Sequence, residues 1–196
     1  MGAWPWFHDG KTVSMRQLAT LLGLSLVSVT LQAQPAAVKP RGFRDLFLTQ
    51  LTDVETKVVE LAEAMPQDKL AWRPGEGVRS IQEVYLHIAL ANYLFTSFIG
   101  AKPPMPMKDL MGMEKVTFSQ ATMLKAVKDS FAHARKAVEG LSNADMEKPT
   151  KMFGKDSTYQ AVLFTMANHM HEHLGQSIAY ARTNGIMPPW TKKNSE

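Results

Sequence analysis

The chain contains 196 residues, a length that favours a single domain with a short appendage. Its apolar content of 45% and charged content of 20% exclude a disordered, collagen-like or coiled-coil protein. With 22 basic and 18 acidic residues and no basic run, the net charge of +4 gives no reason to expect a nucleic-acid partner. Cysteine is absent, which excludes disulfides, thiolate metal ligands and a cysteine nucleophile. The six histidines are therefore the most informative residues.

The amino-terminal segment has the layout of an export signal. An uncharged apolar stretch over residues 18–31 follows Arg16 and leads into small residues around Ala33. The stretch is shorter than the roughly 20 residues that span a bilayer, so we expect no stable membrane span. We predict residues 1–33 to be an extension and signal peptide and residues 34–41 to be a linker, which implies a periplasmic or secreted protein. The alternative is a buried first helix in a cytoplasmic protein.

Four later segments carry apolar residues at alternating steps of three and four, the period of a helix that buries one face. The first helix is expected over about Gly42 to Met65, with Pro66 ending it. The second opens at Ser80-Ile81-Gln82-Glu83, a capping box in which serine and glutamate satisfy backbone N–H groups. It is expected to close at Gly100.

The third and fourth helices begin at motifs of the same capping type. These motifs are Thr117-Phe118-Ser119-Gln120 and Ser157-Thr158-Tyr159-Gln160. The fourth helix runs to Asn184, with Gly185 as the residue after its cap. Because strand-like alternation is missing, the sequence predicts an all-α protein, a four-helix bundle.

The connection between the second and third helices is unusually long. Residues 101–116 include three prolines, whereas bundle connections normally take about two to eight residues. This segment is predicted to be a crossover or a lid. The whole bundle is expected over residues 42–190, which leaves 191–196 as a C-terminal tail.

Polar residues occupy the inward stripe of the fourth helix, where a core normally has leucine. The stripe includes His169, His173 and Gln176. His169 and His173 are one turn apart on one face, a spacing that can offer two nitrogens to one metal ion. His87 is the other histidine on a plausible inward face, so we expect it to supply a third ligand from the second helix. Three neutral imidazoles leave a coordination position open, the pattern of a catalytic zinc site.

The alternative is that each histidine is a core residue with a hydrogen-bond partner. An unpartnered buried imidazole would cost about 1 to 3 kcal/mol, and one metal ion would satisfy all three. Gln176 has two interpretations of equal weight: it holds a ligand or a metal-bound water, or it pairs with a neighbouring core polar atom.

Neighbouring residues are expected to stay outside the site. His171 points about 200° away from the stripe and His133 lies off the stripe of its helix, so both are predicted to face outward. Glu83, one turn before His87, could hold that imidazole, but its capping role already accounts for it. Gly175 inside a long helix predicts close helix packing at that point.

Several motifs stand together in one order along the chain. They are Met65–Lys69 with Trp72–Pro74, Val78–Ile81 with His87–Ala89, and Asn168–Gln176 with Gly185–Pro189. This arrangement resembles the DinB/YfiT-like family of metal-dependent four-helix bundles over about Gly42 to Trp190. The resemblance implies a divalent metal, often zinc or nickel, held by His87, His169 and His173. It also implies a homodimer.

The resemblance also suggests an activity. Characterised relatives include thiol-dependent transferases and isomerases that use low-molecular-weight cytoplasmic thiols, which an exported protein would lack. We therefore expect a divalent-metal-binding protein, with zinc first and nickel as the alternative, that is a metal-dependent enzyme of hydrolase or transferase type. The sequence identifies neither a catalytic residue nor the small-molecule substrate. A non-catalytic metal- or ligand-binding protein and a purely structural metal site are the alternatives.

Overall fold

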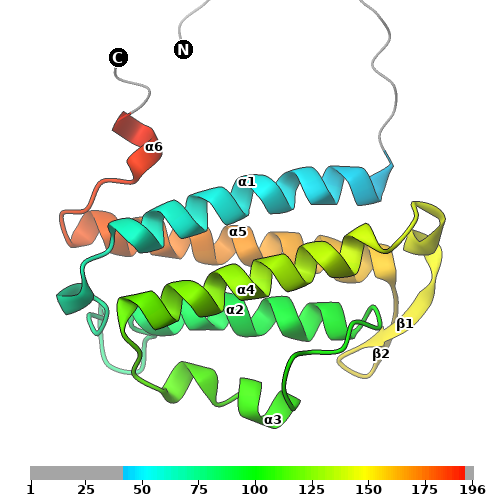
Figure 1. The fold of residues 1–196 in the computed structure, drawn as a ribbon, viewed down its shortest axis with the longest axis horizontal. Coiled ribbons are helices and arrows are strands. Elements are labelled where there is room, and N and C mark those ends of the chain that lie inside the picture. The colour runs from blue at the N-terminus through cyan, green and yellow to red at the C-terminus, as the bar shows by residue number, and fades with distance from the viewer. Residues whose placement is uncertain (1–41, 193–196) are drawn as a thin grey trace, which may run out of the picture. The chain divides into compact units, whose positions relative to one another are not determined.

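The computed structural model describes residues 42–192, so the predicted signal and linker and the last four residues of the tail lie outside the described part of the chain. Four long helices form a bundle (Figure 1). They are α1 (Phe43–Ala64), α2 (Ile81–Ser97), α4 (Gln120–Glu139) and α5 (Tyr159–Thr183). This confirms the predicted all-α four-helix bundle.

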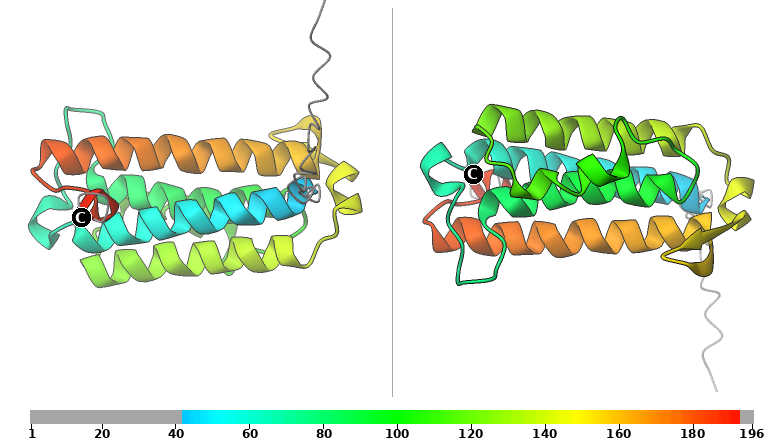
Figure 2. Two further views of the ribbon diagram at one scale, coloured as in Figure 1. Left: turned by 90° about the horizontal axis from the view of Figure 1, so that it is seen from above. Right: turned by 90° about the horizontal axis from the view of Figure 1, so that it is seen from below.

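The helices are arranged as a square in which consecutive long helices are not always neighbours. α1 and α2 lie at opposite corners, and α4 and α5 each pack against both of them (Figures 1 and 2). α2 and α4 run in the same direction, from left to right in Figure 1. The segment between them must therefore return along the length of the bundle, so it is a crossover.

The crossover contains two short helical turns, α3 (Met107–Leu110) and the 3-10 turn η2 (Met113–Lys115). η2 packs against α2, and the side chain of Gln82 on α2 donates to the carbonyl of Val116 and accepts from the backbone N–H of Phe118. These bonds hold the end of the crossover against the start of α2, which places η2 beside the functional site described below.

The N-terminus of α2 has the predicted capping box. The Ser80 hydroxyl accepts from the backbone N–H of Glu83, and the Glu83 carboxylate accepts from the backbone N–H of Ser80 at 2.6 Å. The predicted end of this helix is three residues too long, because α2 ends at Ser97. Gly100, at φ +89°, belongs to the turn that follows.

The predicted starts of the third and fourth long helices are one or two residues early. The true N-caps are Ser119 and Thr158 instead of Thr117 and Ser157. In α5, for example, the Thr158 hydroxyl accepts from the backbone N–H of Ala161. Neighbouring hydroxyl residues fit the capping pattern equally well in sequence, and backbone geometry selects between them.

A small antiparallel hairpin precedes α5, and the sequence analysis did not predict it. Its strands are β1 (Pro149–Met152) and β2 (Lys155–Thr158). Phe153 and Gly154 both have positive φ, as the two central residues of a tight hairpin turn require. The strands are four residues long and largely exposed, so they carry no clear apolar alternation.

The remaining elements close the ends of the bundle. They are η1 (Gln67–Lys69), η3 (Ala144–Glu147) and α6 (Pro189–Lys192). The C-terminus of α5 is as predicted: Asn184 caps it and Gly185 follows at φ +78°. Gly175 differs from prediction, because it is exposed and a Cβ there would meet nothing within 4 Å. Among residues 42–192, no helix is long and apolar enough to cross a membrane.

Candidate metal centre

The three predicted histidines meet at the contact between α2 and α5. His87 lies on α2, and His169 and His173 lie one turn apart on α5. One ring nitrogen of each lies within 4.8 Å of the other two. The Nε2 atoms of His87 and His169 are 3.1 Å apart, and the rings of His169 and His173 have centroids 4.4 Å apart. Helical spacing thus brought together all three residues that the sequence analysis selected.

His87 is oriented by a carboxylate from the crossover. Its Nδ1 lies 2.6 Å from Oε1 of Glu114, and Oε2 of Glu114 accepts from Nε of Arg79 at 2.7 Å. Burial alone would raise the pKa of Glu114, but the hydrogen bonds from Arg79 and His87 outweigh it and hold the pKa below its ordinary value. The ionised carboxylate assigns the imidazole proton to Nδ1, so Nε2 of His87 carries a lone pair toward the other histidines.

Glu114 is the functional residue that the sequence analysis missed. It lies in η2, 27 residues from His87, in a segment without helical periodicity, so no spacing rule points to it. The sequence-based alternative was Glu83, which the structure places in the α2 cap and in an ion pair with Arg73 at 3.1 Å. Capping therefore does account for Glu83, as expected.

His173 is oriented by Gln176 on the next turn of α5. Nδ1 of His173 lies 2.8 Å from Oε1 of Gln176, and the Gln176 amide donates to the hydroxyl of Tyr180 at 3.0 Å. The Tyr180 ring packs edge-on against Trp72 with centroids 5.4 Å apart. This chain assigns the His173 proton to Nδ1 and leaves its Nε2 free to bind a cation.

His169 is half-buried and lies against the ring of Phe95, at a centroid distance of 5.5 Å. Burial, followed by the charges of the neighbouring imidazoles, lowers its pKa to about 4. Burial also lowers the pKa of His173, although the hydrogen bond to Gln176 opposes the shift. Both rings are therefore neutral at pH 7, the protonation state in which imidazole binds metals.

The geometry of the cluster fits one metal ion. Nitrogens about 2.05 Å from a single tetrahedral ion lie about 3.3 Å apart, close to the 3.1 Å between the two Nε2 atoms of His87 and His169. Nδ1 of His169, on the other side of the ring, is buried without a hydrogen-bond partner among the described residues, so no protein group orients this ring as Glu114 and Gln176 orient the other two. Among residues 42–192, no fourth histidine or carboxylate joins the group, so protein ligands alone would leave a coordination position open.

The other two described histidines lie outside the cluster. His171 is exposed, as predicted. His133 is half-buried on α4, where its ring packs edge-on against Tyr93 at 5.0 Å. Burial and the charge of Lys136 lower its pKa. His133 is therefore less exposed than an outward-facing residue was expected to be, because Tyr93 on α2 packs against it, but it lies outside the cluster, as predicted.

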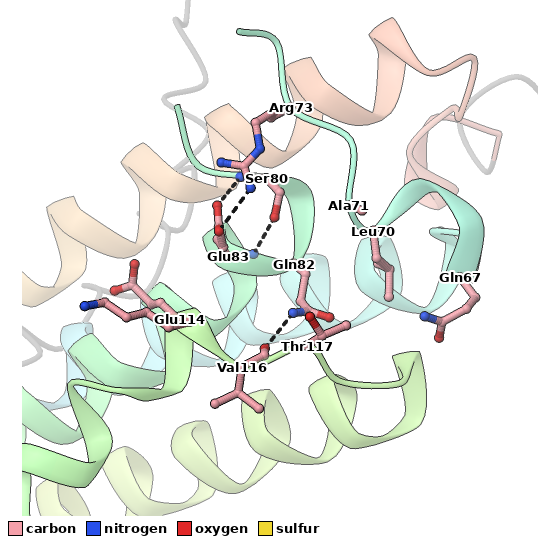
Figure 3. Close-up of a pocket in the computed structure, with 11 residues that line it drawn as sticks. Gln67, Leu70, Ala71, Arg73, Ser80, Gln82, Glu83, Glu114, Val116 and Thr117 are labelled. Carbon is pink, nitrogen blue, oxygen red and sulfur yellow. Dashed lines mark hydrogen bonds and ion pairs between the residues drawn. The ribbon is translucent and has the colours of Figure 1, made fainter. Parts of the chain in front are cut away.

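An open cleft of about 670 Å³ lies near the cluster, although none of the three histidines lines it. Its lining includes Glu114 and Gln176, the two residues that orient His87 and His173. A smaller pocket of about 150 Å³ lies next to it, between η1, the start of α2 and the end of the crossover (Figure 3). The carboxylates of Glu83 and Glu114 line both hollows.

The fold and the cluster define a four-helix bundle with a three-histidine site on two adjacent helices. Residues 50–177 match the model of the DinB superfamily, which covers more than half of the chain. The chain therefore belongs to the DinB superfamily, which confirms the resemblance seen in its motifs.

Solved structures agree on the fold. A DinB-like protein from Bacillus cereus ATCC 10987 is 21% identical, with 74% of this chain and 95% of that chain aligned and a TM-score of 0.66. YfiT from Bacillus subtilis, described as a probable metal-dependent hydrolase with an unusual four-helix bundle topology, is 16% identical over 78% of this chain and 94% of its own, with a TM-score of 0.59. A conserved protein from Enterococcus faecalis is 13% identical over 73% and 97%, with a TM-score of 0.61. No curated protein matches the chain significantly.

Proposed function

We propose that the protein is a metal-dependent enzyme that binds one divalent ion through His87, His169 and His173. The observation that carries the proposal is the convergence of three ring nitrogens within 4.8 Å. In addition, Glu114 and Gln176 hold two of the rings through Nδ1. Metal-ligating histidines typically donate their second ring N–H to a carboxylate or carbonyl oxygen in this way. Zinc is the first candidate because it favours tetrahedral imidazole sites, and nickel is the alternative.

A divalent ion with three imidazole ligands supplies an open position at which a water or a thiol is acidified. The chain's own residues prepare the site for that role. Glu114 and Gln176 fix the tautomers of His87 and His173, and the Phe95 ring covers one side of His169. Arg79 keeps Glu114 ionised and in place.

Two observations support an enzyme in preference to a structural metal site. The described residues offer three ligands to the group, without the fourth that closes a structural site. The cleft beside the group has room for a small molecule. The description of YfiT as a probable metal-dependent hydrolase favours hydrolysis over thiol transfer, and the predicted export points the same way because cytoplasmic thiols would be missing.

Elemental analysis of the purified full chain tests the metal ligands. The wild type is expected to retain about one equivalent of zinc or nickel after dialysis, and His87→Ala, His169→Ala and His173→Ala should each release it. His171→Ala and His133→Ala are the matched controls and should keep the metal. A ligand variant that retains a full equivalent would contradict the assignment.

The open coordination position has its own test, which needs no substrate. In cobalt-substituted protein, an exchangeable water is expected to enhance the relaxation of solvent protons, and an added hydroxamic acid should remove that enhancement by taking the position. Cobalt-loaded protein without any enhancement would indicate a closed, structural site and would rule out the enzyme.

Export remains a proposal that rests on residues 18–31 and the small residues after them. Mass spectrometry of the protein from its native host should find a mature N-terminus near Gln34. An intact chain in the cytosol would exclude export.

We also retain the homodimer as a proposal that rests on the family resemblance alone. Light scattering at micromolar concentration should return twice the mass of one chain. A mass near that of a single chain would exclude it.

A further inference from the structure

The cleft beside the histidines is built from three parts of the chain: the loop before α2, α2 itself and the crossover. Its walls are completed by Gln176 from α5. Because Glu114 and Gln176 hydrogen-bond His87 and His173, a molecule in the cleft lies one side chain away from the histidine cluster. The cleft is therefore the natural place for the part of a substrate that does not react.

Charge in the cleft is uneven. Arg73, Arg79 and Lys115 line it, against the two carboxylates of Glu83 and Glu114. Each carboxylate is already neutralised by hydrogen-bonded partners, Glu83 by Arg73 and the α2 cap, and Glu114 by Arg79 and His87. The lining thus has an excess of one positive charge before any metal ion is added, which favours an anion over a cation.

Two of the cationic groups still have hydrogen-bonding capacity. Arg79 uses its Nε on Glu114, and neither of its Nη atoms has a hydrogen-bond partner among the described residues. A guanidinium fixed at Nε presents these two N–H₂ groups as a fork, which suits a carboxylate or a phosphate. Lys115 is exposed, and its Nζ has no ion-pair partner within residues 42–192. Arg73, in contrast, is bound to both Glu83 and the carbonyl of Val78.

Three apolar residues also line the cleft. They are Val78, Leu90 and Met111, of which Val78 and Met111 are exposed. Apolar walls next to a cationic group suit a small molecule with a short apolar body and an anionic end.

We propose that the cleft binds substrates with a carboxylate or phosphate head group, which Arg79 and Lys115 hold while the apolar body reaches toward the histidine cluster. The inference rests on the proposed metal-dependent function and adds the class of substrate to it. Arg79 then has two contacts at once, Nε on Glu114 and the Nη atoms on the substrate, so substrate binding and the orientation of His87 share one residue.

Hydroxamic acids with different tails provide the test, because the hydroxamate binds zinc while the tail lies along the cleft. Titration calorimetry on zinc-loaded full chain would compare straight tails of two to five methylenes that end in a carboxylate, a phosphonate or a primary amide. The best anionic tail is expected to bind at least tenfold more tightly than the amide of equal length. The tighter of the two anionic tails identifies the head group.

Variants separate the anion contact from the metal site. Lys115→Gln should reduce the preference for the anionic tail about fivefold without changing zinc affinity. Arg79→Lys keeps the charge but loses the fork, so it should reduce the same preference; because Arg79 also holds Glu114, this variant is scored only by the ratio of anionic-tail to amide-tail affinity. Lys155→Gln is the matched control, since it removes the same charge from an exposed position on the hairpin. Equal binding of anionic and amide tails to the zinc-loaded wild type would overturn the inference and leave the metal site standing.

A measurement on metal-free protein tests the anion-binding cleft independently of the proposed metal site. In zinc-free protein, glutarate should shift the backbone amide resonances of Arg79 and Lys115, and the neutral diamide of glutaric acid should not. If zinc fails to bind but glutarate gives these shifts, the proposed function is wrong and the anion cleft remains. If glutarate gives no shifts, or if the diamide gives the same shifts, the anion cleft is excluded.

Discussion

The faces that α1 and α4 present to the core differ sharply from the contact between α2 and α5. α1 and α4 bury an almost purely apolar set of side chains, including Leu51, Val58 and Phe131, each completely buried. The contact between α2 and α5 holds His87, His169 and His173, with polar partners beyond them. All four long helices contribute apolar side chains to the core, but the histidine cluster and its polar partners lie at the contact between α2 and α5. It follows that stability and metal binding can be altered separately.

The largest effect is expected on the free energy of unfolding, when an apolar side chain of α4 is removed from the core. Phe131→Ala removes a completely buried ring from α4 and should lower the free energy of unfolding by about 3 to 5 kcal/mol, measured by denaturant titration. The fraction that remains folded should still bind one equivalent of zinc. A folded Phe131→Ala variant without zinc binding would show that the two regions are not separable.

The next largest effect is expected on zinc affinity, when the carboxylate that holds His87 is removed. Glu114→Ala should weaken zinc binding by about 10- to 100-fold, or about 1.4 to 2.7 kcal/mol, because it removes the acceptor that fixes the ring. Glu114→Gln keeps an acceptor oxygen and should fall between Ala and wild type. Glu147→Ala, an exposed carboxylate in η3, is the matched control for competition titrations with a chromophoric chelator. An unchanged zinc affinity in Glu114→Ala would show that Glu114 does not support the metal site.

A smaller effect is expected at Gln176, because a neutral amide holds His173 less strongly than a carboxylate holds His87. Gln176→Ala should weaken zinc binding by about tenfold, at the low end of the range for such partners. Tyr180→Phe removes the group to which the amide donates and should cost less than Gln176→Ala. The same chelator competition measures both, and a larger loss in Tyr180→Phe than in Gln176→Ala would contradict this order.

The last prediction concerns the metal-free protein, whose stability should depend on pH. The pKa of His169 is lowered to about 4 in the folded protein, against about 6.5 in an unfolded chain. Between these values the unfolded chain binds more protons, so the free energy of unfolding should fall as pH drops from about 6.5 to 4. His169→Ala should flatten the curve in this window, whereas His171→Ala should not. Equal slopes in wild type and His169→Ala would show that this ring is not kept neutral by the fold.

Short-range sequence patterns explain why much of the contact between α2 and α5 could be predicted from the sequence. The i, i+4 spacing of His169 and His173 fixes a common face before any tertiary contact forms, and the cap of α2 depends on two residues three apart. The helical period of α2 likewise placed His87 on an inward face. Three of the residues at the site were therefore accessible to pattern reasoning.

The contacts that the crossover makes with the rest of the bundle could not be predicted from sequence patterns. Glu114 reaches His87 because residues 101–119 run back along the bundle, and no periodicity in that segment encodes the return. The hairpin before α5 was missed because two exposed four-residue strands bury too little to leave an apolar pattern. The interpretation of Gln176 also stayed divided until its contacts with His173 and Tyr180 were known.

Zinc K-edge X-ray absorption on the zinc-loaded full chain would count the imidazole ligands at the metal. We predict three imidazole nitrogens and at least one further light ligand in the wild type. In His169→Ala, kept in enough zinc to reload its weakened site, we predict two imidazoles. A wild-type spectrum without imidazole scattering, or one that His169→Ala leaves unchanged, would contradict the assignment of this cluster as the metal centre.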